Sequence, residues 1–183
     1  MTKPSPLAAI AFLLAMQAPL AAPAAASPAT ATPPPTSSDD CPNVAVDTNK
    51  FLSGQTIAVR APRGSLSLVV VDTVATKERG LMCVVRVPHA RGMLFVFAPP
   101  DADQGFWMKN TLVPLDMVFV RADGIVSKVA VNVPATTRGT PDDAVARADG
   151  MGRFVIELGA GDAAKLGIAA GTKLSLPPLQ AKE

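Results

Sequence analysis

The sequence predicts a mainly β protein, with a single compact barrel- or sandwich-like domain of short strands and one or two short helices. Short runs rich in Val, Ile, Leu and Phe recur at intervals of roughly 8–12 residues, which is typical of barrels and sandwiches. Turn signals such as Pro-Arg-Gly and Ala-Asp-Gly separate these runs, and helical periodicity is confined to very short segments. The chain beyond residue 26 has the length of one domain with one hydrophobic core.

The start of the chain has the pattern of a secretory signal peptide. Lys3 precedes an apolar run from Leu7 to Met16, and an Ala-rich tract ends at Ala26, where we expect cleavage. The alternative is an uncleaved membrane anchor, but the apolar run is shorter than the roughly 20 residues that a spanning helix needs. We therefore predict a signal peptide at 1–26, a Pro/Ala/Thr-rich disordered linker at 27–40, and a β domain at 41–183 in a periplasmic or secreted protein.

The charge balance excludes some partners. Without residues 1–26, whose one charge is Lys3, basic and acidic residues are almost equal in number. Such a chain has no excess of positive charge to attract nucleic acid or an anionic membrane, so we expect neither as a partner, and we expect no membrane span in the mature form.

The expected elements follow from alternation, apolar runs and turn residues. Residues 55–61 and 65–72 flank Pro-Arg-Gly and predict a hairpin, and residues 115–121 and 125–131 flank Ala-Asp-Gly and predict another. Residues 74–79, followed by Gly80, predict one helical turn, and a second short helix is expected at 162–166. The remaining expected strands are 93–98, 105–109, 153–158 and 172–176, and residues 132–152 are expected to form a long loop.

Four sequence motifs resemble the DUF192 (UPF0127) family. In chain order they are Gly80-Leu81-Met82, Gly92–Phe97, Phe106–Thr111 and Pro114-Leu115-Asp116. The similarity runs from about Ile57 to Leu176. It implies a small, mostly β, single-domain protein that is frequently exported and whose family has no established function. The chain departs from the family pattern at Val84 and in residues 88–91.

Residues 106–111 and Asp116 are the candidate site. On a strand, Phe106 and Met108 share one face and suit the core, whereas Trp107 and Lys109 share the other. Trp107 offers a stacking plane, and Lys109, Asn110, Thr111 and Asp116 offer polar groups for a small polar molecule, a glycan or an envelope protein. The alternative is structural: Trp107 fills one end of the domain, and the polar groups satisfy local turns.

Asp116 lies between Leu115 and Met117, and a carboxylate buried in such a strand needs partners. Lys109, or the amides of the turn at 110–113, would provide them. A hydrolase-type enzyme that uses Lys109 and Asp116 as an acid/base pair is the competing function, but we expect binding rather than catalysis and predict no cofactor.

Sulfur-containing residues suggest two further hypotheses. Cys41 and Cys83 are the only cysteines, and in an oxidising compartment they are candidates for a disulfide, although two free thiols are the alternative. Thioethers select Cu(I), so Met-based copper handling by Met82, Met93, Met108 and Met117 is the other alternative function. Core filling explains methionines equally well. Cys83 and His89 are the one conceivable nucleophile and base pair, because the chain holds a single histidine.

Overall fold

The computed structural model describes residues 55–137 and 139–182. These residues all belong to one compact unit. The predicted signal peptide and linker lie outside the described residues, so their boundaries stay predictions.

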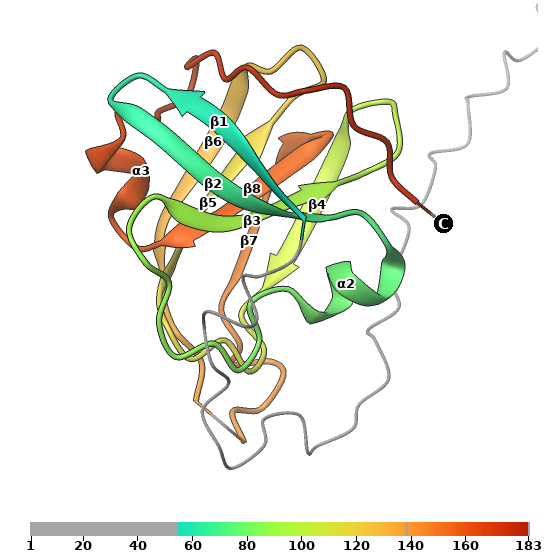
Figure 1. Ribbon diagram of the computed structural model, residues 1–183. Helices are drawn as coiled ribbons and strands as arrows, with labels where there is room; N and C mark the ends of the chain where they lie inside the picture. Colours follow the sequence, from blue (N-terminus) through green and yellow to red (C-terminus); the bar gives the residue numbers. More distant parts are fainter. Residues whose placement is uncertain (1–54, 138, 183) are drawn as a thin grey trace, which may run out of the picture. The chain divides into compact units, whose positions relative to one another are not determined.

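The predicted mainly β class is confirmed: the described chain forms eight strands in two sheets and two short helices (Figure 1). In chain order the elements are β1 (Thr56–Ala61), β2 (Gly64–Val71), α2 (Val74–Arg79), β3 (Arg91–Val96), β4 (Ala102–Trp107), β5 (Leu115–Val120), β6 (Val126–Val133), β7 (Arg147–Gly152), β8 (Phe154–Gly159) and α3 (Asp162–Lys165). Neither helix, nor any other in the described part, is long and apolar enough to cross a bilayer.

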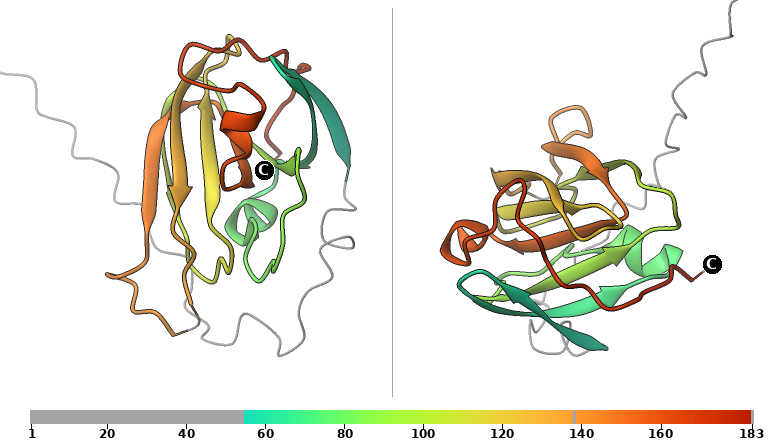
Figure 2. Two further views of the ribbon diagram at one scale, coloured as in Figure 1. Left: turned by 90° about the vertical axis from the view of Figure 1, so that its left-hand side faces the viewer. Right: turned by 90° about the horizontal axis from the view of Figure 1, so that it is seen from above.

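The larger sheet has six strands in the order β1-β2-β3-β8-β5-β6. Both predicted hairpins, β1–β2 and β5–β6, are present, and β2 and β3 form the parallel pair. The second sheet contains only β4 and β7, paired antiparallel. The two sheets do not close into a barrel but form a sandwich-like arrangement, which the two views of Figure 2 show from the side and from above.

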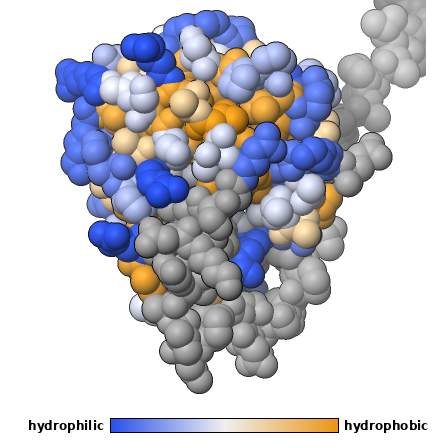
Figure 3. Space-filling model, viewed as in Figure 1, coloured by the Kyte–Doolittle hydropathy of each residue, from blue (hydrophilic) through white to orange (hydrophobic). Residues whose placement is uncertain are grey.

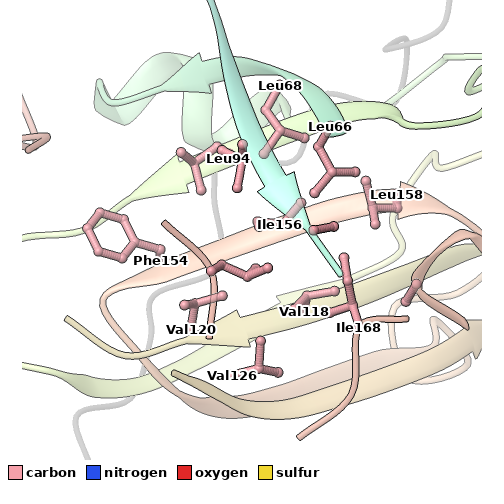
Figure 4. Packing of buried hydrophobic residues seen from close by; sticks show 14 of the residues in the cluster. Leu66, Leu68, Leu94, Val118, Val120, Val126, Phe154, Ile156, Leu158 and Ile168 are labelled. Atoms are coloured by element: carbon pink, nitrogen blue, oxygen red, sulfur yellow. The ribbon is translucent and has the colours of Figure 1, made fainter. Parts of the chain in front are cut away.

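One face of the six-stranded sheet carries the first hydrophobic cluster. Alternate residues of β8, namely Phe154, Ile156 and Leu158, pack there against Leu66 and Leu68 of β2 (Figure 4). The region of α3 and the C-terminal tail add further apolar side chains to this cluster. On the surface of Figure 3, hydrophobic residues gather near the centre of the visible face and hydrophilic residues surround them.

The other face of the same sheet carries the second cluster. It is covered by the β4–β7 sheet and by the segment that follows α2, which contributes Leu81 and Val84. Because side chains alternate along a strand, the side chains of Val155 and Glu157 in β8 lie on this second face. A carboxyl group therefore occupies a position where an apolar residue would be expected.

Two predicted segments are wrong. Residues 132–152 are not one long loop, because β6 continues to Val133 and β7 pairs with β4. Strand β7 contains two glycines and few β-forming residues, which hid it in the sequence. Gly150 is required by close packing: a Cβ there would lie 2.5 Å from the Phe119 ring. Residues 172–176 form no strand in the described structure, only an isolated bridge between Ile125 and Lys173.

Candidate functional site

A cavity of about 240 Å³ lies beside α2 and the β4 strand. We call it the α2–β4 cavity. Residues 77–82 form one wall, Phe95, Phe97, Gly105, Phe106 and Trp107 form the aromatic side, and Thr111 and Glu157 complete it. Since liquid water takes about 30 Å³ per molecule, the volume corresponds to roughly eight waters. A small organic molecule fits such a space.

Glu157 contributes the least expected group in the cavity wall. The residue is 5% exposed, and its Oε2 is the one buried side-chain oxygen or nitrogen without a hydrogen-bond partner among the described residues. The Leu81 N–H donates a hydrogen bond to this side chain and leaves Oε2 unpaired. Buried polar groups in folded proteins are nearly always paired, so an unpaired one calls for an explanation.

Burial sets the protonation state of this carboxyl group. Desolvation raises the pKa of Glu157 to about 8, and the hydrogen bond from the Leu81 amide acts in the opposite direction without cancelling it. At neutral pH the side chain is therefore mostly a neutral acid. In that form its second oxygen carries a proton and is a hydrogen-bond donor.

The turn after α2 brings its backbone close to the carboxyl group. α2 starts at a capping box formed by Thr73 and Thr76 and ends at Gly80. Gly80 has φ +47°, a conformation that favours glycine, and a Cβ there would lie 3.2 Å from Phe95 Cζ and 3.6 Å from Glu157 Oε2. Gly80 therefore lets the turn pack closely against Phe95 and Glu157, so that the Leu81 amide reaches the carboxyl group.

The aromatic side of the cavity is held by edge-to-face packing. Phe106 contacts Phe95 with ring centroids 4.9 Å apart and Phe97 with centroids 6.2 Å apart, both near perpendicular. Two cations of the protein lie on aromatic rings of the cavity wall. Lys77 Nζ is 5.1 Å from the Phe97 centroid, and the Arg147 guanidinium is 5.6 Å from the centroid of the Trp107 ring. The wall is apolar, with positive charge at its margin.

The structure divides the predicted site residues into two groups. Trp107 and Thr111 line the α2–β4 cavity, whereas Lys109, Asn110 and Asp116 do not. Lys109 forms an ion pair with Asp142. Asn110, at φ 52°, accepts a hydrogen bond from the Cys83 amide through its carbonyl. β4 ends at Trp107, two residues earlier than predicted, so Lys109 and Asn110 belong to the turn that follows it.

Asp116 has a structural role and lies away from this cavity. It is 1% exposed, and its carboxylate accepts hydrogen bonds from the Asn132 amide at 2.9 Å and the Ala163 amide at 3.0 Å. The prediction that Lys109 or the turn at 110–113 would pair with Asp116 is wrong. Strand β6 bulges opposite Asp116, where the register passes from Leu115↔Val133 to Met117↔Ala130. The carboxylate satisfies an amide in this bulge.

The comparisons with known proteins decide the family. Residues 57–176 match the model of DUF192, described as an uncharacterized ACR. The chain belongs to the DUF192 family. No curated protein matches it significantly.

Two solved structures are similar to this DUF192 chain. One, from Sinorhizobium meliloti, is described as a candidate transcription regulator. It has 29% identity and a TM-score of 0.57, and the match covers 67% of this chain and 95% of that one. The other is a protein of unknown function from Novosphingobium aromaticivorans. It has 29% identity and a TM-score of 0.56, and the match covers 78% of this chain and 98% of that one.

Three of the four motif segments that resemble DUF192 meet at the cavity. They contribute residues 80–82, Phe95 and Phe97, and Phe106, Trp107 and Thr111. The fourth, Pro114-Leu115-Asp116, supports the bulge in β6 instead. Sequence reasoning about this DUF192 chain missed Glu157, although one signal was present: a single acidic residue interrupts the apolar run Phe-Val-Ile-Glu-Leu.

The other candidate residues of this DUF192 protein have ordinary structural environments. His89 Nδ1 lies 2.9 Å from Asp162 Oδ1. Burial acts to raise the pKa of Asp162, but hydrogen bonds from His89, the Ala90 amide and Lys165 outweigh it and lower that pKa. Cys83 is buried, and its predicted partner Cys41 lies outside the described residues, so the disulfide stays a prediction.

The methionines proposed for copper are separated by environment. Met93, Met108 and Met117 are buried in the second hydrophobic cluster, whereas Met82 lines the cavity. Core packing accounts for the three buried ones. Within the described residues, no cluster of three or more His, Cys, Asp or Glu side chains could hold a metal ion.

Proposed function

We propose that this protein is an exported, single-domain binding protein that holds a small organic ligand in the α2–β4 cavity. The observation that carries the proposal is the unpaired Glu157 oxygen in the cavity wall. Leaving a buried polar group without a partner costs about 1–3 kcal/mol. Hydrophobic residues surround Glu157 in the sheet, so a leucine or methionine would avoid this cost. A ligand that forms a hydrogen bond with Glu157 would explain why a carboxyl group stands at this position, whereas packing does not explain it.

The walls of the cavity support binding rather than solvent storage. Ligand sites are mostly apolar concavities with a small number of polar groups that fix orientation. Here phenylalanine and tryptophan rings form one side, and Glu157 provides a polar group at the inner wall. Trp107 and Thr111 are the two predicted site residues that belong to this site, and Lys109 and Asn110 shape the adjoining turn.

The enzyme alternative has no such support. Lys109 is paired with Asp142, and both carboxylate oxygens of Asp116 accept backbone amides, so these two side chains do not form an acid/base pair. The proposal therefore assigns recognition to the cavity and no chemical step to these residues.

Gly105 allows a direct test of where ligands bind. It lies on β4 in the cavity wall, its φ is not positive, and a Cβ there would meet nothing within 4 Å. Gly105→Leu should therefore fill space in the cavity without straining the backbone, while Gly105→Ala is the matched small change. We expect a panel of small acids, amides, amines and sugars to contain compounds that raise the Tm of the wild type and of Gly105→Ala.

The same compounds should have little effect on Gly105→Leu. Trp107 is the only tryptophan in the chain, so its fluorescence reports on the cavity directly and should change saturably with the same compounds. If Gly105→Leu responds as strongly as the wild type, the ligand binds elsewhere and the proposed site is wrong.

Export and the disulfide belong to the same proposal. We expect the protein to be recovered from the periplasm or medium with its mature N-terminus near Ser27, and to react with a thiol reagent only after reduction. Cell fractionation, N-terminal sequencing and thiol titration measure this. Two reactive thiols in the unreduced, denatured protein would show that Cys41 and Cys83 are not bonded.

A further inference from the structure

We infer that the ligand of the α2–β4 cavity is a small molecule with an apolar, ring-like body and a carboxylate or amide oxygen, and that this oxygen accepts a hydrogen bond from Glu157. This inference rests on the proposed function and adds the chemical class of the ligand. It depends on the hydrogen-bond geometry of Glu157, the charges around the cavity and the cations on its aromatic rings.

The hydrogen-bond pattern of Glu157 requires an acceptor. The Leu81 amide donates to the side chain, and Oε2 remains without a partner among the described residues. In the neutral acid, the oxygen that accepts from Leu81 keeps that bond and the proton resides on Oε2. Glu157 then offers an O–H donor, which an ammonium ligand cannot satisfy but a carboxylate or amide oxygen can.

The charges around the cavity also favour a ligand with an acceptor oxygen over a cationic ligand. Lys77, Glu78 and Arg79 from α2 are the other charged residues that line it, and Arg147 from β7 lies behind Trp107. With Glu157 neutral, the lining has two cations and one anion. In the two strands that flank β8, the residues paired with Glu157 are Met93 and Met117, which are uncharged. A cationic ligand would be repelled, whereas an acceptor or an anion would be attracted.

Two of the four aromatic rings already have a cation of the protein on them. Lys77, which lines the cavity, lies on Phe97, a position that an ammonium ligand would seek in an aromatic cage, and Arg147 lies on the Trp107 ring without lining the cavity. Phe95 and Phe106 remain as apolar surface of the cavity. The ligand body that suits this surface is an uncharged ring or a compact hydrocarbon group.

Three probes of nearly equal size separate the classes: benzamide and benzoate, which carry acceptor oxygens, and benzylamine, which carries a cation. Binding to the full mature protein is followed by Trp107 fluorescence and confirmed by calorimetry at pH 7 and pH 9. We expect saturable binding of benzamide and benzoate at pH 7, and binding of benzylamine at least tenfold weaker.

The pH dependence identifies the form of Glu157 that binds. Benzamide does not titrate in this range, and its affinity should fall by about tenfold for each pH unit above the pKa of Glu157 in the free protein, which is about 8. In Glu157→Gln the amide oxygen accepts from Leu81 and the amide nitrogen donates to the ligand, as the neutral acid does. This variant should bind benzamide within about threefold of the wild type at pH 7 and lose the decrease at high pH.

Glu157→Leu removes the donor and should weaken benzamide binding at least tenfold. If Glu157 had only a structural role, Glu157→Gln would not keep its affinity for benzamide and at the same time lose the dependence of that affinity on pH. Stronger binding of benzylamine than of benzamide, increasing toward pH 9, would overturn the inference in favour of an amine ligand while leaving the proposed cavity intact. If none of the three probes binds, or if Gly105→Leu binds them unchanged, the cavity itself is not the site and both proposals fail.

Discussion

The Glu157→Gln variant is expected to be more stable than the wild type at pH 8 and above, by several kcal/mol. The two proteins should have similar stability near pH 4.5. The difference arises because the wild type must either keep Glu157 protonated in the folded state or ionise it where no cation pairs with it. Glutamine has almost the same shape and never ionises.

The direction in which the free energy of unfolding changes with pH follows from the pKa values of Glu157 in the folded and unfolded chain. Below about pH 4.5, Glu157 is protonated in both the folded and the unfolded chain and contributes no difference. Between pH 4.5 and about 8 the unfolded chain releases this proton and the folded chain retains it, so the free energy of unfolding falls as pH rises. Each pH unit in this window costs about 1.4 kcal/mol, and above pH 8 the loss levels off.

Denaturant unfolding of both proteins from pH 4.5 to 9 measures this difference. Other carboxylates change the stability of both proteins alike, so the quantity to compare is the difference between variant and wild type at each pH. Glu78→Gln is the matched control, since Glu78 lines the same cavity but is exposed. A difference between Glu157→Gln and wild type that does not depend on pH would contradict the raised pKa.

The second large effect is expected for Asp116→Ala, which should lower the free energy of unfolding by about 4 kcal/mol. The substitution leaves the Asn132 and Ala163 amides without their acceptor, and a buried unpaired group costs about 1–3 kcal/mol each. These two amides connect β5 to the bulge in β6 and to the start of α3, so one residue holds three elements together.

Denaturant unfolding at neutral pH measures this loss. Asp116→Asn keeps the volume and one acceptor oxygen, so it should lose about half as much stability. Ligand-induced changes in Trp107 fluorescence should remain in Asp116→Asn, because Asp116 does not line the cavity. A loss below 1 kcal/mol for Asp116→Ala would show that water replaces the carboxylate at both amides.

Most of the fold was predictable because its signals are local. The β1–β2 hairpin, the glycine that ends α2 and the β5–β6 hairpin each depend on a short sequence with a known turn preference. Strand β7 was not predictable in this way. Its glycines make room for the Phe119 ring, and that requirement exists only once β5 and β7 lie together.

The candidate site was only partly predictable, for a similar reason. Trp107 and Thr111 stood out as an aromatic and a polar residue in one short stretch, and the cavity includes both. Asp116 had the same appearance, but its partners come from residues 16 and 47 positions away, which no local pattern shows. Glu157 was not chosen as a site residue, because only the pairing of β8 with β3 and β5 shows that this acidic residue is buried.

The division of the cavity between two sheets has a consequence for the evolution of the family. Glu157 belongs to the six-stranded sheet, whereas Phe106 and Trp107 belong to β4, which is hydrogen-bonded only to β7 within the described structure. Substitutions of the exposed residues of β7 can therefore tilt the aromatic wall and change the size of the proposed ligand, without altering the cavity-lining residues or the strand that holds the carboxyl group.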